Sequence, residues 1–529
     1  MCLFGAVGAF KAGGPWATVR SWLAPPPPPQ QQQLHAPKPE AAAAPVHAET
    51  LILGAGVAGL SCATYLQRLA PGNEVLVIEA SDAAGGRVRT DVHPTEGYLL
   101  DRGFQVFIEE YPEARRLLGQ EGYEALGIRP FCAGAKVFKD GALHTVSDPL
   151  RAPQDLLASL VSPIGSLEDK IRVGLYSLKS RFGPDFDWAE ERQGEGEGER
   201  EGERKGEEAA TSKFLSSALS LSSSIVDSFF TPFYKGIFLA PLEDQSSRMF
   251  EFVFQMFARG SASLCDNGLG MGAVGAQLAR GLPVRYNSRA VEIRPGTGTG
   301  TGTGAGAGWS VVLQGGDMLT CNNLVVATDP EQFVQLLAGA AMQQQQQQVA
   351  AQIPPARGSV CLYYGIDSAE DRPFPVPAEN RAALVLNGDF DEQRRCHVNN
   401  VCFPSDVAPS YAPPGKHLAS VTLVGSENLD LHELVLDHAV RTQLGQWWGA
   451  DKVQRWKLLR IYRIPYAQPA QTPLPLVASK PVRLLGRGGV GAGTGSLYVC
   501  GDHRDTPTLN GAIKSGRLVA EDIAAAAAR

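Results

Sequence analysis

Gly54-Ala55-Gly56-Val57-Ala58-Gly59 stands between a short apolar, β-rich run at residues 50–53 and a segment with helical apolar spacing at residues 57–69. Residues 74–78 read as a second strand. A strand, a glycine turn, a helix and a strand within about 30 residues form a βαβ unit. Since two strands joined through a helix run parallel, this stretch predicts a parallel sheet.

Each glycine of this turn has its own task in a dinucleotide site. Gly54 permits the tight turn, Gly56 lets the backbone approach a pyrophosphate, and Gly59 allows the helix to pack closely on the strand. The helix start at Val57 and Ala58 supplies N–H groups and a partial positive charge. The stretch therefore predicts binding of a dinucleotide.

The residues after the second strand indicate which dinucleotide is bound. Glu79 ends that strand and suits the hydroxyls of a ribose, and Gly85-Gly86-Arg87 follows it. Gly86 allows a second loop to close over the pyrophosphate, and the Arg87 guanidinium suits two oxygens of a phosphate. In this continuation the chain resembles the large family of flavin-dependent amine oxidases, phytoene desaturases and protoporphyrinogen oxidases. The resemblance implies FAD as the cofactor.

Further segments carry the same resemblance. Residues 100–105 resemble the segment that lies against the isoalloxazine, which implies contacts from Gly103, Phe104 and Gln105. Residues 267–293 resemble the return of the chain to the dinucleotide domain, and Val291 is the implied backbone partner of the adenine. Residues 324–328 resemble the strand beneath the pyrophosphate.

The C-terminal part resembles the flavin motif that closes this family's fold. A strand at residues 497–500 is followed by Gly501 and Asp502, whose carboxylate would accept hydrogen bonds from the ribityl chain. The helix that starts near Gly511 and Ala512 would direct N–H groups at the N1 and C2 edge of the flavin.

The fold expected from these features is α/β, with a Rossmann-like FAD-binding domain of the Gly-Gly-Arg type and an inserted α+β substrate domain. The FAD-binding domain is predicted from residues 48–108, 267–330 and 490–529. The substrate domain is predicted from residues 109–266 and 331–489. A disordered leader is expected over residues 1–47.

Composition narrows the class of partners. The chain has 529 residues and a net charge of −7. It has no basic stripe of the kind that nucleic-acid binding requires, and no apolar run of transmembrane length. Its nine cysteines are scattered without a Cys-x-x-Cys pair, so neither a disulfide framework nor a metal site is predicted. A peripheral membrane contact stays open.

The leader and the repeats are not expected to join the core. Residues 1–39 lack acids, which favours a transit peptide and a plastid location over a merely disordered extension, a secretory signal or a cytoplasmic protein. Residues 194–208, 296–308 and 343–348 are of low complexity and are predicted to be insertions in surface loops.

The expected function is hydride transfer from a C–H or C–N bond of an organic substrate to flavin N5, with oxygen or a quinone as electron acceptor. An apolar isoprenoid or another pigment-pathway compound is the favoured small-molecule substrate. A polyamine or other amine oxidase is an alternative, as is a non-catalytic escort protein with a flavin fold.

No catalytic side chain is predicted from the sequence. Ordinary packing or solvent contact is the preferred interpretation of several polar side chains near the expected flavin site. They are Tyr363, Tyr364, Tyr466, His503 and Arg504. The resemblance also implies that a lysine can lie near flavin N5, and Lys235 is a candidate for it, but a surface lysine is the preferred interpretation. The aromatic residues between 214 and 257 are interpreted as core before they are interpreted as a substrate tunnel.

Overall fold

A computed structural model describes residues 46–148, 150–188, 208–296, 308–337, 343–373, 384–391, 397–472, 480, 482–485 and 495–528. All of them belong to one compact unit, Pro45–Arg529. The leader, residues 194–207 of the first repeat and residues 297–307 of the second lie outside the described residues. In the part of the chain that is described, no helix has the length and apolar character needed to cross a bilayer.

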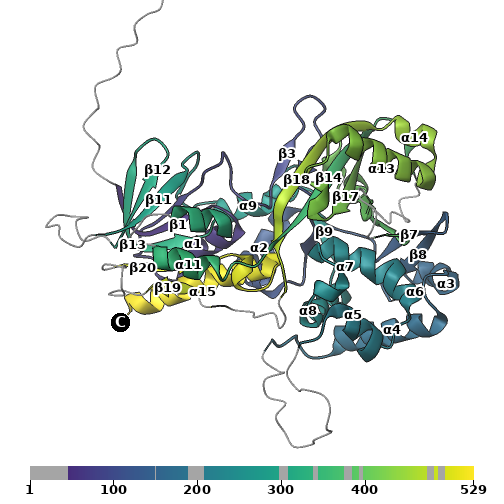
Figure 1. The fold of residues 1–529 in the computed structure, drawn as a ribbon, viewed down its shortest axis with the longest axis horizontal. Helices are drawn as coiled ribbons and strands as arrows, with labels where there is room; N and C mark the ends of the chain where they lie inside the picture. Colours follow the sequence, from purple (N-terminus) through teal and green to yellow (C-terminus); the bar gives the residue numbers. More distant parts are fainter. Residues whose placement is uncertain are drawn as a thin grey trace, which may run out of the picture. The chain divides into compact units, whose positions relative to one another are not determined.

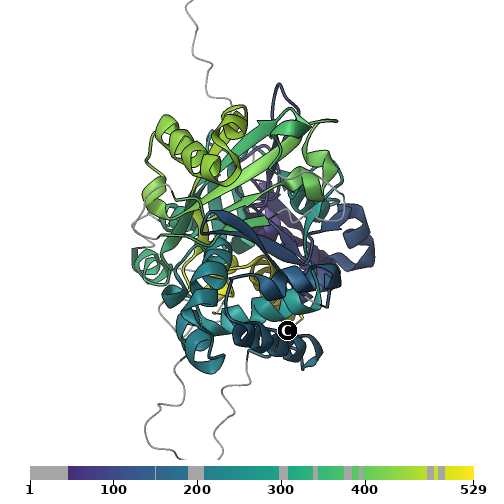
Figure 2. The same cartoon turned by 90° about the vertical axis from the view of Figure 1, so that its right-hand side faces the viewer.

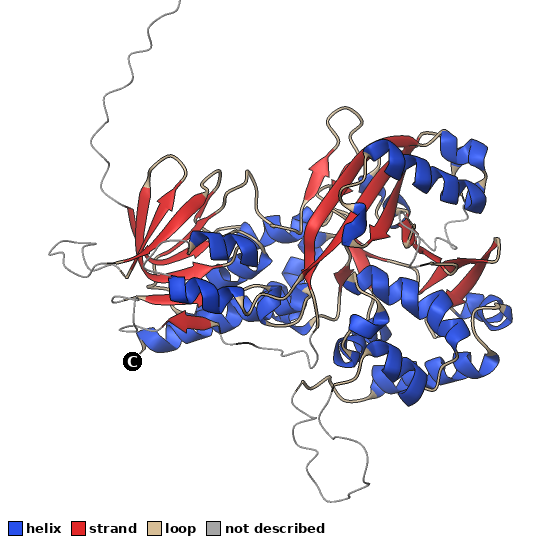
Figure 3. Ribbon diagram, in the orientation of Figure 1, coloured by secondary structure: helices blue, strands red, loops and turns tan. Residues whose placement is uncertain are grey.

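The first sheet is built around the predicted βαβ unit. Strands β1 (Val46–Leu53) and β2 (Val75–Ile78) pair in parallel on either side of α1 (Val57–Leu69) in the chain. The strand order is β10 (Val284–Arg285), β2, β1, β13 (Met318–Val326), β12 (Trp309–Leu313), β11 (Ala290–Pro295). The far half of β13 pairs in parallel with β20 (Ser496–Val499), which also pairs with β19 (Arg483–Leu485). This arrangement, drawn in Figures 1 and 3, confirms the predicted α/β class.

Helices α1 and α15 (Leu509–Ala527) pack against each other, although they lie far apart in the chain. A Cβ atom on Gly516 of α15 would lie 2.3 Å from the carbonyl oxygen of Ala58, so only glycine permits this close crossing. Helices α2 (Pro112–Leu126) and α9 (Gly272–Ala279) pack beside them. The start of the chain and its end thereby share one core.

A second, mixed sheet forms from the intervening segments. Its strand order is β18 (Lys457–Pro469), β14 (Ala356–Ile366), β17 (His417–Val424), β16 (Asn400–Cys402), β15 (Leu384–Asn387), β7 (Gly134–Lys139), β8 (Ala142–Ser147). Helices α13 (Glu433–Trp448) and α14 (Ala450–Gln454) cover one face, as the yellow-green helices in Figure 2 show. Helix α12 (Pro404–Val407) connects β16 to β17.

Two small sheets and a group of helices complete the architecture. The small sheets are β3 (Thr90–Val92) with β4 (Leu99–Asp101), and β5 (Phe107–Ile108) with β9 (Ala262–Cys265) and β6 (Ile128–Pro130). The helices are α3 (Leu156–Val161), α4 (Leu167–Phe182), α5 (Thr211–Lys213), α6 (Ser223–Ile225), α7 (Thr231–Phe238) and α8 (Ser247–Arg259). Aromatic rings of this group pack against one another, for example Tyr234 against Phe250 with 4.6 Å between centroids, which agrees with the core interpretation of residues 214–257.

Three expectations about secondary structure differ from the structure. The strand expected over residues 284–293 is broken at Asn287, which has a positive φ of 51°, because β10 pairs with β2 whereas β11 turns to pair with β12. The glutamine run is not a loop but helix α11 (Gln343–Ala350), where Gln346 Nε2 donates to the Val334 carbonyl of α10 (Pro330–Leu336) at 3.0 Å. Glutamine has a good helix propensity, and the hydrogen bond from Gln346 holds α11 against α10. Strand β1 begins at Val46, two residues before the expected end of the leader.

Candidate functional site

The glycine turn between β1 and α1 has the geometry that the sequence predicts. Gly54 has a φ of +108°, and a Cβ atom there would lie 2.7 Å from the Ala327 carbonyl oxygen. A Cβ atom on Gly59 would lie 2.1 Å from the Gly54 oxygen. Both positions therefore exclude any side chain through backbone contacts.

Gly56 is different, because open space lies beside it. The nearest atom to a Cβ on Gly56 would be the Gly86 Cα, 3.9 Å away. Gly56 is also the N-cap of α1, and no side chain caps the helix start at Val57 and Ala58. An uncapped helix start next to open space is suited to an anionic group.

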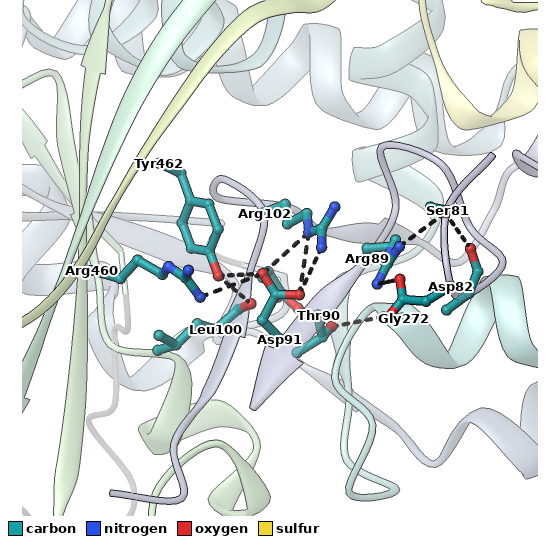
Figure 4. Close-up of polar contacts among 12 residues, drawn as sticks. Ser81, Asp82, Arg89, Thr90, Asp91, Leu100, Arg102, Gly272, Arg460 and Tyr462 are labelled. Carbon is teal, nitrogen blue, oxygen red and sulfur yellow. Dashed lines mark hydrogen bonds and ion pairs between the residues drawn. The ribbon is translucent and has the colours of Figure 1, made fainter. Parts of the chain in front are cut away.

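Glu79 lies beside this turn and is held in place by backbone and side-chain donors. Its carboxylate accepts from the Ala55 N–H at 2.8 Å and from the Ser81 N–H and hydroxyl at 2.8 and 2.7 Å. Arg89 in turn donates to Ser81 Oγ at 3.2 Å and to Asp82 at 3.0 Å, as Figure 4 shows. Since a carboxylate has about four acceptor positions and three are used here, Glu79 retains capacity for about one more donor, such as a ribose hydroxyl.

Arg87 joins the first sheet to the second. It forms a bidentate pair with Asp502 and donates to the Ala467 carbonyl at 3.0 Å. Its guanidinium lies 5.3 Å from the centroid of the Tyr466 ring, so Tyr466 stacks on the arginine. Gly501, directly before the buried Asp502, donates its N–H to Ser515 Oγ at 2.9 Å.

The segment Gly103-Phe104-Gln105 lies beside Arg87. Gln105 Nε2 donates to the Arg87 carbonyl at 2.7 Å and to the Arg102 carbonyl at 3.1 Å, whereas Gln105 Oε1 is buried without a partner in the described residues. The Phe104 ring packs edge-on against Phe131, with 6.4 Å between centroids. An unsatisfied acceptor at this position is suited to a bound donor.

The start of α15 differs in detail from the expectation. The helix begins at Leu509, and the N–H groups of Gly511 and Ala512 already donate to Thr508, through its Oγ1 and its carbonyl oxygen. A Cβ atom on Gly511 would lie 2.1 Å from the Thr506 carbonyl oxygen, so this glycine is needed for packing. The N–H groups of Leu509 and Asn510, two residues earlier, become the better candidates.

Val291 lies in β11 at a bulge. Ala290 and Glu292 have register partners on β12, and the pairing shifts between them. A bulge leaves the backbone groups of the extra residue outside the regular ladder. The backbone N–H and C=O of Val291 are thus suited to the adenine contact predicted for them.

Asp101 is a site residue that the sequence interpretation missed. Its carboxylate is buried and accepts from Thr90 Oγ1 at 2.5 Å, Tyr411 OH at 2.7 Å and the Met271 N–H at 3.1 Å. Burial outweighs these hydrogen bonds and raises the pKa of Asp101 to about 6. Asp101 lies within the 100–105 segment that carries the resemblance, but the sequence assigned no role to its side chain.

Asp91 anchors the neighbouring β3–β4 hairpin to β18. It accepts from Arg102 Nη2 at 2.9 Å and from Tyr462 OH at 2.8 Å, and Arg460 lies 3.9 Å away (Figure 4). Burial opposes the charge of Asp91, but the hydrogen bonds from Arg102 and Tyr462 prevail and lower its pKa. The hairpin that carries Asp101 is thereby fixed to the second sheet.

The other polar side chains considered from the sequence lie on β14 and directly after Asp502. Tyr363 directs its hydroxyl at the Gly103 carbonyl, 3.5 Å away, whereas Tyr364 on the other face of β14 donates to Asp437. His503 and Arg504 are buried, so packing and not solvent contact is the correct interpretation of both side chains. Burial lowers the pKa of His503 to about 4.

Lys235 is buried rather than a surface lysine, with its ammonium 4.5 Å from the Phe390 ring centroid. Phe390 follows β15, and strands β16 and β17 separate β15 from β14, the strand that contacts Gly103. The structure therefore does not bring Lys235 to the predicted flavin segment.

Together these residues form a cradle that fits an extended dinucleotide. It offers open space at Gly56, an uncapped helix start, a guanidinium at Arg87, a carboxylate at Glu79 and an unsatisfied acceptor at Gln105. A fold and a site of this kind define a dinucleotide-binding protein. Residues 57–524 match the family described as "Flavin containing amine oxidoreductase", and the chain belongs to that family. Family membership makes it an FAD-dependent oxidoreductase.

Individual relatives agree with this class. A coproporphyrinogen III oxidase of Propionibacterium freudenreichii subsp. freudenreichii is 31% identical over 170 residues, which cover 30% of this chain and 31% of that protein. A chloroplastic/chromoplastic 15-cis-phytoene desaturase of an Oncidium hybrid cultivar is 35% identical over 74 residues, or 14% of this chain and 12% of that protein. The matched segments thus span less than a third of these curated relatives.

The fold itself extends over nearly the whole length of a solved structure. The crystal structure of a protein from Exiguobacterium sp. 255-15, assigned as a protoporphyrinogen oxidase, superimposes with a TM-score of 0.60 at 15% identity. The superposition covers 91% of this chain and 99% of that chain.

Proposed function

We propose that this protein removes hydrogen from a C–H bond of an apolar pigment-pathway compound, with a porphyrinogen as the first substrate to test. The curated relatives that match the chain include coproporphyrinogen oxidases and a phytoene desaturase, which supports this class of substrate. FAD, when bound, supplies a two-electron acceptor whose N5 takes a hydride from the substrate, and oxygen or a quinone removes the electrons.

The observation that carries the proposal is the set of apolar side chains that pack around Gly103 and Phe104. A Cβ atom on Gly103 would meet Ile464 Cδ1 at 2.5 Å, Tyr363 points at the Gly103 carbonyl, and Phe104 packs on Phe131. Aromatic and aliphatic walls favour a substrate with an apolar face.

The residues of this chain have separate tasks in the proposed reaction. Glu79 would bind the ribose of the adenosine part, and Gly56 and Arg87 would contact the pyrophosphate. Asp502 orients Arg87. Gln105 and the first turn of α15 supply polar atoms to the ring system, while Tyr363 and Ile464 exclude water from the substrate side.

Anaerobic flavin bleaching tests the proposal. The purified protein, loaded with FAD, is mixed under argon with coproporphyrinogen III, protoporphyrinogen IX, phytoene or putrescine. Loss of the oxidised flavin absorbance with a porphyrinogen or phytoene, and none with putrescine, is the expected result. Bleaching by putrescine alone would instead establish the amine oxidase alternative.

An escort protein with a flavin fold is the alternative of another class. Such a protein would stay colourless when it is folded and supplied with FAD. Release of stoichiometric FAD from the purified chain, measured by fluorescence after denaturation, would exclude that alternative.

We infer a plastid location for the protein from its leader. Residues 1–39 lack acids and the phytoene desaturase relative is chloroplastic, which supports import. Sequencing the N-terminus of the protein isolated from its cells should find it between residues 35 and 48. An intact Met1 would contradict import with cleavage.

A further inference from the structure

A row of apolar side chains runs along the outer side of α4. It consists of Leu167, Ile171, Leu175, Leu178 and Phe182, whose exposed fractions range from 39% to 76%. Their spacing of three or four residues places them on one side of the helix. A surface helix ordinarily presents polar side chains to solvent, so this face is unusual.

The inner side of α4 is already satisfied by packing. Tyr176 contacts Phe254 of α8, with 4.8 Å between ring centroids, and Ser180 is buried. With 3.6 residues per turn, Tyr176 and Ser180 lie opposite the exposed row. The outer row is therefore not needed for the core.

Helix α3 extends the apolar surface. Leu156, Leu157, Leu160 and Val161 are all exposed. Lys170 ties the two helices together, because its ammonium donates to the carbonyls of Leu160 and Ser162 at 3.0 and 2.5 Å. We call these four residues and the five of the α4 row the α3–α4 surface.

Cations flank the row on both sides of α4. Lys170 and Arg181 lie along one flank, and Arg172 and Lys179 lie along the other. Of the two acids of α4, Asp169 is buried and Glu168 pairs with Arg172 at 2.6 Å. The surface is thus apolar with a positive margin, on a chain whose net charge is −7.

We propose that the α3–α4 surface docks on a membrane that contains anionic lipids. The apolar row would enter the boundary between headgroups and acyl chains, and the flanking lysines and arginines would reach lipid phosphates. A second copy of this chain is a poorer occupant, because a symmetric contact would place like charges opposite each other.

A cavity of about 260 Å³ lies between this surface and the proposed flavin segment. Its lining includes Gln154 and Asp155, directly before α3, and Phe131, which packs on Phe104. Lys136 and Arg151 also line this cavity, so much of its lining is polar and the membrane proposal does not depend on it.

Vesicle sedimentation of the full FAD-loaded chain tests the membrane proposal. Vesicles of phosphatidylcholine alone are compared with vesicles that also contain phosphatidylglycerol. We expect binding to the anionic vesicles that weakens as salt is raised. Ile171→Glu with Leu175→Glu should lower the apparent affinity by about tenfold or more.

The matched control is Leu434→Glu with Val435→Glu, because these α13 side chains are also exposed but lie outside the surface. FAD content and thermal midpoint show that both variants are folded. Absence of wild-type binding, or an equal loss in the control, would overturn the proposal. A dimer that the α4 variant dissociates, without vesicle binding, would assign the surface to a second copy. Vesicle binding without substrate bleaching would leave this surface intact and refute only the proposed function.

Discussion

Arg87 donates two parallel hydrogen bonds, each 2.8 Å long, to the carboxylate of Asp502, which lies 415 residues further along the chain. The pair connects the loop after β2 with the end of β20. Such a bidentate pair fixes the plane of the guanidinium and is stronger than a neutral hydrogen bond. The Arg87 guanidinium is therefore oriented by a residue from the C-terminal part of the chain.

Arg87→Lys is expected to weaken FAD binding by about tenfold, or ~1.4 kcal/mol, because lysine keeps the charge but loses the planar fork. Titration of the apoprotein with FAD, followed by flavin fluorescence, measures the change. Arg441→Lys removes a guanidinium from the Asp437 carboxylate on α13, away from the cradle, and is the control. Equal FAD affinity in wild type and Arg87→Lys would contradict the placement of the pyrophosphate.

Gly56→Val and Gly59→Val should separate binding from folding. The valine at position 56 would enter the open space near Gly86, so we expect a folded protein that no longer retains FAD. The valine at position 59 would collide with the Gly54 carbonyl, so we expect an unfolded or aggregated chain. Circular dichroism and released flavin measure the two effects; a Gly56→Val protein that keeps its FAD would refute the cradle.

Asp101→Asn should change how stability depends on pH. The pKa of Asp101 is raised to about 6 in the folded protein, above the unfolded value of 3.8, so the folded state holds its proton more tightly. This stabilisation is present at low pH and is lost as pH rises from about 4 to about 6. Between these limits wild type should lose about 3 kcal/mol relative to Asp101→Asn.

Denaturant unfolding of both proteins at about pH 3 and about pH 7.5, on either side of that interval, measures the difference. Other titrating groups are common to both proteins and cancel in the comparison. A difference that does not change with pH would mean that Asp101 is not the buried, proton-binding group.

Lys235→Met should leave the rate of flavin bleaching within about threefold of wild type, because the lysine packs on Phe390 rather than beside Gly103. Stopped-flow reduction with whichever substrate bleaches the flavin measures this rate. The same variant should lose stability, since a cation over an aromatic ring contributes about 0.5–2 kcal/mol. A rate loss of a hundredfold or more would restore Lys235 as a catalytic residue.

Local sequence patterns were sufficient for the βαβ unit. The range expected for α1 agrees with the structure residue by residue, and β2 differs by one residue, because the apolar spacing and glycine turn lie close together in the chain. The same patterns failed at residues 284–293, because the first part of this segment pairs with β2 and the second part pairs with β12. Periodicity cannot reveal a turn that pairing with two different strands imposes.

The sequence by itself determined the dinucleotide turn, the acid at its ribose end and the α/β class, because each depends on residues within about 30 positions of one another. Only the tertiary structure decided that Arg87 faces Asp502, that Asp101 is buried beneath Tyr411, and that the outer row of α4 has no core to cover. These relationships depend on which surfaces meet when distant segments pack, and spacing along the chain carries no information about that.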